Sequence, residues 1–547
     1  MWWKRTTVYQ IYPRSFYDSD GDGIGDLRGV IAKLGYLQEL GVETLWLSPF
    51  FRSPQADFGY DISDHYSIAP EFGTTDDCHA LVDEVHRRGM KIVFDMVLNH
   101  TSAEHPWFLE SKSAIDHPRR DWYIWRRGKK PGGKAPPNNW RSMIGGSGWH
   151  HDPVSDEWYF ASFLGFQPDL NYRNPEVKAA MLDVVRYWLG QGVDGLRLDI
   201  FNAIFKDASF VDNPFSWRPA PSEENPNGFF QRHQHTIDHP DTLAFARELR
   251  QVVDQFDEPR RFLVGEVFGN LEDVKRYCGE AADGLHLVFL FKTLKLGFSA
   301  RRVRELVTEF ERSFSEPFTP TYVFSNHDRL RSSHRFNTVK AKLLTTLQLT
   351  VRGVPFIYYG EELGMENHEI PLHEGLDPVA ARFGYMPRFA VRWLRRRGIL
   401  LNRDECRSPM QWTSGVNAGF TDGKKPWLAV HPNSATVNVE RQEQDPQSLL
   451  WCYRNLLALR ARVPALQAGS LEWIPVAPKV VGYRRQLGDE RADVFLNFSA
   501  RAQILPLDGY DGFELFSNHA RITDVIPSSY ILAPYEGVVL SRAPSSA

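Results

Sequence analysis

The sequence predicts an α/β chain built on a (β/α)8 barrel, with a subdomain inserted after the third strand and an all-β domain at the C-terminal end. Two observations predict the barrel. Eight short apolar runs follow one another along the chain, and amphipathic helical stretches separate them. Runs rich in Val, Ile, Leu and Phe on both faces are typical of parallel strands buried on both sides. Eight strand–helix alternations favour a barrel over an open sheet, and 547 residues leave room for smaller domains.

The strands are expected where apolar runs are bounded by polar segments. Their ranges are 7–12, 44–50, 91–100, 195–200, 261–268, 284–291, 321–328 and 353–362. Helical patterns lie between them, at 26–41, 76–89, 174–192 and 241–256. Several of these patterns end in Gly, as helix C-termini often do. Asn174 stands at a predicted N-cap and Pro175 at the first helical position.

Composition divides the chain into four parts. We assign residues 1–100 and 172–465 to the barrel, 101–171 to the inserted subdomain and 466–547 to an antiparallel β domain. The insert is rich in Trp, Gly, Pro and His and shows only short strand-like pieces. Beyond about residue 466, the runs at 480–487, 492–500 and 537–543 predict antiparallel strands. The long segment 366–402 carries a basic run, RWLRRRG, which is interpreted as a solvated face, with a partner site as the minor alternative.

The charge balance and the cysteines exclude several classes of protein. The 64 basic and 68 acidic residues give a net charge of −4, which argues against a nucleic-acid binder. Four widely separated cysteines without zinc-type spacing predict free thiols in a reducing compartment. No signal-peptide core and no membrane-length apolar run is found, so we expect a cytoplasmic protein that does not enter a membrane. We expect a monomer or a small homo-oligomer.

Three of the predicted strands end in an acid: Asp199, Glu266 and Asp328. In a (β/α)8 barrel the C-terminal ends of the strands carry the catalytic groups. One such acid is commonplace, but clustered carboxylates repel one another, so three on one rim indicate a function. Glycoside hydrolysis uses such a cluster, because one ionised carboxylate attacks the anomeric carbon while a protonated carboxyl serves the leaving oxygen.

Arg197 precedes Asp199 by two positions on one strand, so the two side chains are expected on the same face. A cation there holds Asp199 as the anion, while burial and like charge raise the pKa of the acid, Glu266. A purely structural ion pair is compatible with this role.

Four ordered motifs carry a resemblance to a known family. DMVLNH (95–100), GLRLD (195–199), GEVF (265–268) and SNHD (325–328) resemble the four signature regions of the α-amylase superfamily, glycoside hydrolase family 13. QPDLN (167–171) resembles an additional region of oligo-1,6-glucosidases and related α-glucosidases. DSDGDGIGDL, DFGYDISDHY, YYGEELGM and RDECRSPMQW add to the resemblance, which spans residues 1 to about 465.

The resemblance implies catalytic roles by position. Asp199 would be the nucleophile and Glu266 the general acid/base, while Asp328 would grip the hydroxyls of the distorted sugar. His100 and His327 would hydrogen-bond the same glucosyl unit, and Arg197 would orient the nucleophile.

The resemblance also implies a pocket closed at one end. Tyr60 resembles the stacking platform for the glucose ring, and Asp57 and Arg407 resemble the pair that closes the pocket. Phe163 and Gln167 fall where this subfamily lines the pocket. The segment after the third acid reads RLR where QPR is usual, which leaves the aglycone side open.

An acidic loop follows the first strand. DSDGDGIGD offers Asp18, Asp20, Asp22, Asp26 and the Ile24 carbonyl at spacing similar to that of an EF-hand, but Gly29 stands where an EF-hand needs Glu. The resemblance implies one structural Ca²⁺ or Mg²⁺ here and no organic cofactor. A solvated acidic turn is the alternative.

The function implied is an exo-acting, retaining α-glucosidase on short α-glucosides such as maltose, isomaltose or sucrose-like sugars, with transfer to other acceptors. Ile200, after the nucleophile, tilts the expectation toward α-1,6 links, whereas segment 366–402 departs from the oligo-1,6-glucosidase pattern. Sucrose isomerisation, cleavage of trehalose or its phosphate, and glucosyl transfer stay open as alternatives. A non-enzymatic scaffold resembling transporter heavy chains is disfavoured, because those proteins carry a transmembrane helix and lack the full acid set.

Overall fold

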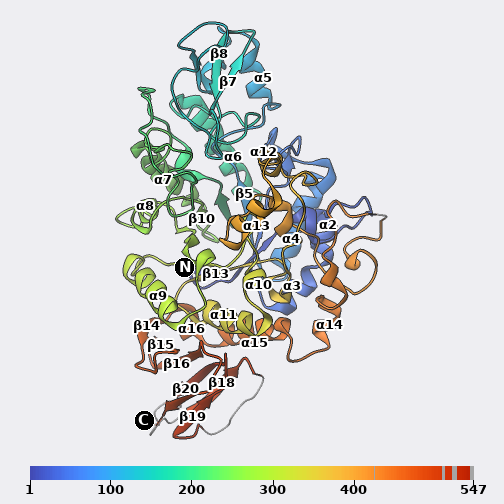
Figure 1. Ribbon diagram of the computed structural model, residues 1–547, viewed down its shortest axis with the longest axis vertical. Coiled ribbons are helices and arrows are strands. Elements are labelled where there is room, and N and C mark those ends of the chain that lie inside the picture. The colour runs from blue at the N-terminus through green and yellow to red at the C-terminus, as the bar shows by residue number, and fades with distance from the viewer. Residues whose placement is uncertain (424, 508–511, 520–525, 543–547) are drawn as a thin grey trace. The chain divides into compact units, whose positions relative to one another are not determined.

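The computed structural model describes residues 1–423, 425–507, 512–519 and 526–542 (Figure 1). The chain forms two compact units. The terminal unit comprises residues 1–45, 85–90 and 290–547, and the central unit comprises residues 46–84 and 91–289. Each unit is described by itself below.

All eight predicted barrel strands are present and are buried. They are β1 (Val8–Ile11), β2 (Thr44–Leu47), β5 (Lys91–Met96), β9 (Gly195–Leu198), β10 (Phe262–Gly265), β11 (Leu287–Val288), β12 (Thr321–Val323) and β13 (Val354–Tyr358). In the central unit β5, β9, β10 and β11 pair in this order, all parallel. In the terminal unit β13 pairs in parallel with both β1 and β12. The predicted (β/α)8 fold class is confirmed.

Helices follow the strands along the chain. The central unit holds α6 (Pro175–Gly190), α7 (Pro240–Val253) and α8 (Leu271–Arg276), and α4 (Thr75–Arg87) crosses the boundary between the units. Helices of the terminal unit are α1 (Pro13–Phe16), α2 (Leu27–Ala32), α3 (Leu34–Leu40), α9 (Ala300–Ser313), α10 (Ser332–Arg335) and α11 (Thr338–Thr350). The pattern at 26–41 predicts one helix, but the structure has two, because Lys33 leaves the helical conformation. The Lys33 ammonium lies over the rings of Tyr17 and Trp412, at 4.1 and 4.3 Å.

Helix starts follow the predicted chemistry. The Asn174 side chain accepts a hydrogen bond from the Glu176 N–H, and Pro175 occupies the first position of α6. The same device, with a histidine as cap, begins α7 at His239 and α5 (Pro106–Ser113) at His105.

Residues 101–171 contain short elements only. They are α5 and an antiparallel sheet with the order β6 (Trp125–Arg127), β8 (Glu157–Phe160), β7 (Trp149–Asp152). Figure 1 shows α5, β7 and β8 together. A cluster of rings, with Trp140, Trp149 and Phe160 buried, forms the core. A two-stranded sheet, β3 (Phe51–Arg52) with β4 (Asp64–Ile68), precedes this segment.

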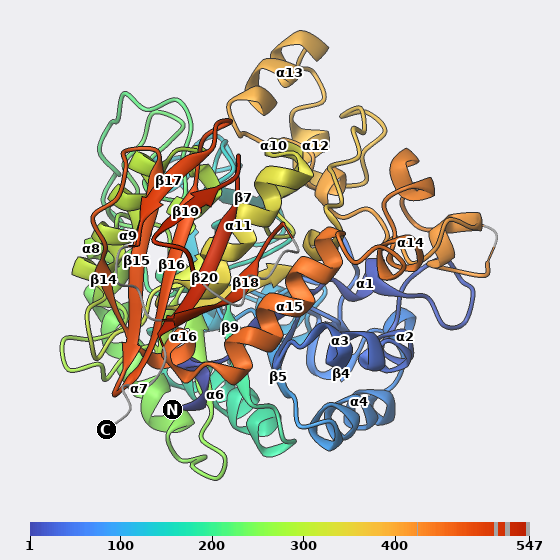
Figure 2. The ribbon, with the colours of Figure 1, turned by 90° about the horizontal axis from the view of Figure 1, so that it is seen from below.

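The C-terminal segment forms antiparallel sheets, as its patterns predict. The larger sheet has the order β14 (Ser470–Trp473), β15 (Val480–Leu487), β16 (Glu490–Asn497), β20 (Gly537–Arg542), β18 (Gly512–Ser517), and β17 (Gln503–Pro506) pairs with β19 (Ser529–Leu532). Figure 2 shows β15, β16 and β20 running side by side. The last residue of the predicted run 537–543 lies outside the described residues. Helices α15 (Leu449–Arg462) and α16 (Pro464–Ala468) lead into the sheet, and buried Arg485 donates to the Thr350 and Leu466 carbonyls.

Segment 366–402 carries α12 (Pro378–Arg382) and α13 (Arg388–Arg396), and α14 (Val439–Glu443) follows later. No side chain of α13 is buried, which agrees with the predicted solvated face. All four cysteines are buried and free, as their spacing predicts. Within the described residues no helix has the length and apolar character needed to cross a membrane.

Candidate active site

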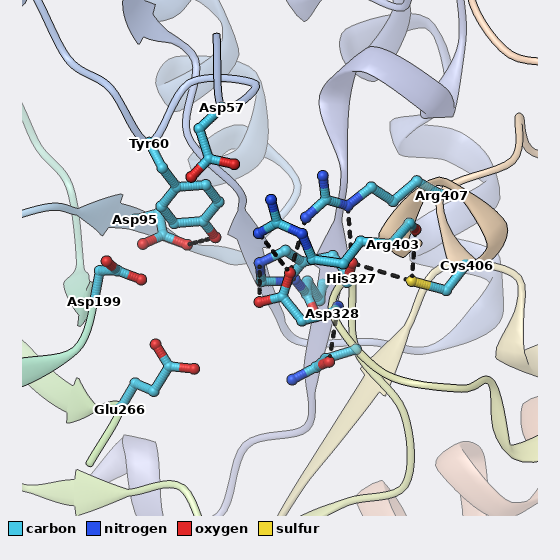
Figure 3. A network of polar contacts seen from close by, with 12 residues as sticks. Asp57, Tyr60, Asp95, Asp199, Glu266, His327, Asp328, Arg403, Cys406 and Arg407 are labelled. Atoms are coloured by element: carbon cyan, nitrogen blue, oxygen red, sulfur yellow. Dashed lines mark hydrogen bonds and ion pairs between the residues drawn. The ribbon is translucent and has the colours of Figure 1, made fainter. Parts of the chain in front are cut away.

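The central unit gathers its acids at the ends of three neighbouring strands. Asp95 is the register partner of Arg197, because β5 and β9 pair in parallel. Asp199 and Glu266 follow the last residues of β9 and β10, and their N–H groups continue the pairing to the Met96 and Leu198 carbonyls. Parallel pairing therefore brings these four side chains to one edge of the sheet. Figure 3 shows the three carboxylates of Asp95, Asp199 and Glu266 on the same side of the view.

Arg197 holds three carboxylates on one guanidinium. Its Nη1 lies 2.7 Å from Asp95 Oδ1 and 2.8 Å from Asp199 Oδ1, and its Nη2 lies 2.7 Å from Glu266 Oε2. All four side chains are buried. The predicted contact between Arg197 and Asp199 is present, and Glu266 shares the same cation.

Burial and crowding set the protonation of this cluster. Burial raises the pKa of Asp199 to about 6 against the opposing charge of Arg197, and the neighbouring charge of Asp95 raises it further. A hydrogen bond with Glu266 lowers it. Burial likewise raises the pKa of Asp95 to about 6. Although burial disfavours the charged guanidinium, the carboxylates hold the pKa of Arg197 well above its usual value. The cluster thus contains one permanent cation and carboxyls that titrate close to neutrality.

The backbone is strained beside Asp199. Ile200 adopts a left-handed conformation with φ 35° and ψ 50°. A β-branched residue rarely occupies this region, and such outliers concentrate at functional sites. The turn directs the Ile200 N–H to Glu266 Oε2 at 3.3 Å, so the strained residue joins the ends of β9 and β10.

Aromatic and polar side chains of the central unit surround the acids. The Tyr60 hydroxyl and the Trp46 indole N–H both contact Asp95 Oδ2, each at 3.2 Å. His100 Nε2 lies 3.2 Å from the Tyr60 carbonyl oxygen. Burial lowers the pKa of His100, so its ring is neutral at pH 7.

The remaining predicted pocket residues of this unit contact one another. Gln167 Nε2 donates to Asp57 Oδ2 at 3.0 Å, and both side chains are buried. The Phe163 ring lies 5.9 Å from the His100 ring and packs against the cluster that contains Ile200. The structure therefore brings all the predicted residues of the central unit into one neighbourhood.

The terminal unit contains a group of its own, built around Asp328 in the segment that follows β12. Asp328 Oδ2 lies 3.1 Å from His327 Nε2, and Oδ1 accepts from Arg407 Nη2 at 2.8 Å and from Arg403 Nη1 at 3.4 Å (Figure 3). Burial would raise the pKa of Asp328, but His327 and the two arginines lower it well below 3.8. Asp328 is therefore ionised at neutral pH. Gln10 Nε2 contacts His327 Nδ1 at 2.8 Å.

Three residues of these groups were missed by reasoning from the sequence. Asp95 opens the DMVLNH motif, and its registered position opposite Arg197 appears only once the strands pair. Arg403 lies in RDECRSPMQW, but only Arg407 was singled out there. Asp377 is fully buried and contacts the Arg403 guanidinium at 2.7 Å, and it lies in the long segment 366–402, where no site residue was predicted. No signal in the local sequence marks Asp377 as buried. The predicted pairing of Asp57 with Arg407 joins the two units and stays a prediction.

The acidic loop after β1 brings three of its carboxylates together. Oxygen atoms of Asp18, Asp20 and Asp22 lie within 4.8 Å of one another. Burial raises the pKa of Asp22, and the charges of its acidic neighbours add to the effect. Asp26 instead caps α2, because its carboxylate accepts hydrogen bonds from Ser19 and from the Gly29 N–H. The contribution of the Ile24 carbonyl to this site stays a prediction.

Known proteins resemble the chain over nearly its whole length. A family model described as the α-amylase catalytic domain matches residues 10–469. A probable α-glucosidase of Rhizobium meliloti (strain 1021) is 38% identical, covering 96% of this chain and 94% of the relative. An oligo-1,6-glucosidase of Parageobacillus thermoglucosidasius is 37% identical, covering 93% and 92%. The crystal structure of an α-glucosyl transfer enzyme matches with a TM-score of 0.87 at 36% identity, covering 99% of both chains.

Proposed function

Because the chain belongs to the α-amylase family, we propose that it is an exo-acting, retaining α-glucosidase that releases glucose from the non-reducing end of short α-glucosides. One observation carries the proposal: Asp199 and Glu266 occupy the two ends of a single buried guanidinium. Two carboxyls that share one guanidinium lie close together, which suits the short separation of roughly 5–5.5 Å typical of retention better than the roughly 6.5–9.5 Å typical of inversion.

The proposed reaction has two displacements. The Asp199 carboxylate attacks the anomeric carbon and forms a covalent glucosyl ester while the Glu266 carboxyl gives its proton to the departing glycosidic oxygen. Glu266, now ionised, takes a proton from a water that attacks the same carbon from the opposite face and releases Asp199. Two inversions restore the α configuration.

The electrostatics support this division of roles. With a pKa of about 6, Asp199 is mostly ionised at pH 7 and is a competent nucleophile. The hydrogen bond with Glu266 lowers the pKa of Asp199, which favours Asp199 as the anion that accepts and Glu266 as the carboxyl that donates. Asp328, held ionised by its cations, suits hydrogen bonding to sugar hydroxyls and stabilisation of positive charge on the ring.

The other predicted residues would bind the glucosyl unit. We assign the stacking platform to Tyr60, sugar hydrogen bonds to His100 and His327, and the closed end of the pocket to Asp57 with Arg407. Gln167 supports Asp57 through its 3.0 Å hydrogen bond. A closed end explains exo action, because only a chain terminus can enter.

We also propose that Asp18, Asp20 and Asp22 hold a divalent cation. The donor set fits, since hard cations prefer carboxylate oxygens and the three acids converge. The Ca²⁺ or Mg²⁺ would neutralise the loop and stabilise the fold. The chemistry of the acids on Arg197 needs no part of this loop.

Maltose, isomaltose and sucrose-like glucosides are the proposed substrates, and four free buried thiols support a reducing, cytoplasmic setting. A second candidate function is glucosyl transfer, in which a sugar or alcohol hydroxyl replaces water in the second displacement. It is favoured by the likeness to an α-glucosyl transfer enzyme across 99% of the chain.

A product panel tests the proposal. Maltose, isomaltose, sucrose and trehalose are incubated with the protein, and products are followed by chromatography and by proton NMR of the anomeric signals. We expect glucose first released as the α anomer, and transfer products that grow with acceptor concentration. Absence of glucose from every substrate, or release of β-glucose, would overturn the proposal.

A further inference from the structure

Helix α13 exposes a row of aromatic side chains. Phe389 and Trp393 stand four positions apart, so they lie on one face of the helix, and they are 78% and 52% exposed. Tyr385, in the turn before the helix, is 82% exposed. Single apolar side chains are common on protein surfaces, but several large rings gathered on one short segment indicate a surface for interaction.

Arginines flank this aromatic row. Arg388, Arg392 and Arg396 form the neighbouring row of the same helix, at successive steps of four residues. Beyond the last turn, the Arg397 guanidinium lies over the Trp393 ring, 4.1 Å from its centroid. All four of these arginines are exposed. A short helix that carries basic side chains beside exposed aromatic ones is typical of segments that lie on a membrane surface.

The positive charge of this face is not balanced by the protein. Within the part of the chain that the structure describes, the four exposed arginines form no ion pair, whereas Arg395 contacts Glu369 and Glu405. Like charges at a spacing of four residues destabilise a helix. The face is cationic although the whole chain has a net charge of −4. An anionic partner outside the chain would relieve this repulsion.

The opposite side of α13 faces its own unit. Ala390, Val391 and Leu394 on that side are partly buried. Figure 2 shows α13 at the outer edge of the terminal unit, beyond α10 and α12. This placement leaves the aromatic and basic rows open to a large, flat partner.

We propose that this face of α13 binds the surface of an anionic phospholipid bilayer. The arginines contact the phosphates and acidic headgroups through charge-assisted hydrogen bonds. The rings of Tyr385, Phe389 and Trp393 enter the headgroup region, where Trp and Tyr are enriched in membrane proteins. The contact is peripheral, with the helix lying in the plane of the interface. It goes beyond the proposed function and does not depend on it.

Two other kinds of partner fit this face less well. A symmetric contact with a second copy of the chain would place α13 against α13 and bring arginines onto arginines. A single-stranded nucleic acid would stack its bases on the rings, but it also needs a basic groove that follows its backbone, and α13 has only nine residues. A bilayer surface engages both rows at once.

Cosedimentation of the full chain with lipid vesicles tests the proposal. Vesicles of phosphatidylcholine alone are compared with vesicles that contain about one quarter phosphatidylglycerol, an anionic lipid. The aromatic variant is Phe389→Ser/Trp393→Ser, and the arginine variant is Arg392→Gln/Arg396→Gln.

Each of these variants has a matched control. Phe215→Ser/Trp217→Ser removes another exposed aromatic pair, whose ring centroids lie 4.9 Å apart, from the central unit. Arg301→Gln/Arg302→Gln removes two exposed arginines from α9. Because all the substituted side chains are exposed, every variant is expected to fold, which its Tm checks.

We expect the wild type to bind the anionic vesicles more tightly than the neutral ones, and more weakly as salt is added. The aromatic variant is expected to bind about tenfold more weakly or less, because burying one large apolar side chain accounts for a change of that size. The arginine variant is expected to bind about 30-fold more weakly, since each basic residue near an anionic surface accounts for about a fivefold change. Both controls are expected to bind like the wild type.

Several results would overturn the proposal. Failure of the wild type to bind anionic vesicles would exclude the bilayer as the partner. Wild-type binding by the aromatic variant would show attraction by charge alone, and equal losses in a variant and its control would show that α13 is not the contact. A labelled single-stranded oligonucleotide and sedimentation velocity test the other partners. Oligonucleotide binding or self-association that the aromatic variant loses, without vesicle binding, would assign this face to that partner instead.

Discussion

Replacing Asp199 with Asn separates catalysis from stability. The amide is nearly isosteric with the carboxylate but cannot attack the anomeric carbon, so hydrolysis of p-nitrophenyl α-glucoside is expected to fall by about 10⁴-fold or more. The stability of the Asn variant should instead increase relative to that of the wild type. A pKa raised by burial from 3.8 to about 6 means that the fold disfavours the charged form by about 3 kcal/mol.

The sign of this effect depends on pH. Below about pH 4, Asp199 is protonated in both folded and unfolded chains, and the wild type carries no penalty. Above about pH 6 it is ionised in both, and the penalty is complete. The Asn variant should therefore become more stable than the wild type as pH rises from 4 to 6, and this difference should persist at pH 7.5. For a chain of this length, about 3 kcal/mol corresponds to a Tm increase of about 2–3 °C.

Differential scanning calorimetry at pH 4.5 and 7.5 measures the shift. Asp377→Asn is the control of opposite sign. Arg403 lowers the pKa of Asp377 despite its burial, so its amide variant should melt below wild type at pH 7.5. A lower Tm for the Asp199 variant at pH 7.5, or more than about 1% residual hydrolysis, would refute the reasoning.

Further outcomes follow from the same contacts. Glu266→Gln should lower kcat/KM for maltose by at least about 100-fold but spare kcat/KM for α-glucosyl fluoride, whose leaving group needs no proton in the first displacement; equal losses in kcat/KM would remove Glu266 as the acid. The acid limb of kcat/KM should fall near pH 6, as Asp199 protonates, and a limb below pH 4 would contradict its raised pKa. Arg403→Lys should lower kcat/KM by weakening the support of Asp328, and wild-type kinetics would show that this contact is dispensable. Chelation should lower Tm and added Ca²⁺ restore it, with a weaker response in Asp22→Asn; a chelator-insensitive Tm would argue for a solvated turn.

The strands were predictable because burial on both faces leaves a continuous apolar run. All eight runs contain the observed strands, although the run at 284–291 yields only two residues, Leu287 and Val288, in regular pairing. Arg197 beside Asp199 was predictable for a similar reason, since strand alternation is a local rule.

Long-range partners were harder to predict. Asp95 meets Arg197 through strand register between segments about a hundred positions apart. Asp377 contacts Arg403 from segment 366–402, in which the basic run at 393–399 was the feature that the sequence analysis interpreted. The interruption of the helix at Lys33 could not be predicted from the local pattern either. The Lys33 ammonium lies against the rings of Tyr17 and Trp412, which come from separate parts of the chain. Local pattern sets the elements, whereas charges brought together by the fold decide which loop residues become buried.

The central claim is that Asp199 forms a covalent bond to glucose while Glu266 supplies and recovers the proton. Incubation with a 5-fluoro-α-glucosyl fluoride, followed by peptic digestion and mass spectrometry, tests it directly, because the fluorine slows release of the glucosyl ester. The account predicts one added fluoroglucosyl group on the peptide that contains Asp199. A label on another residue, or an unlabelled protein that still turns over the reagent, would contradict it.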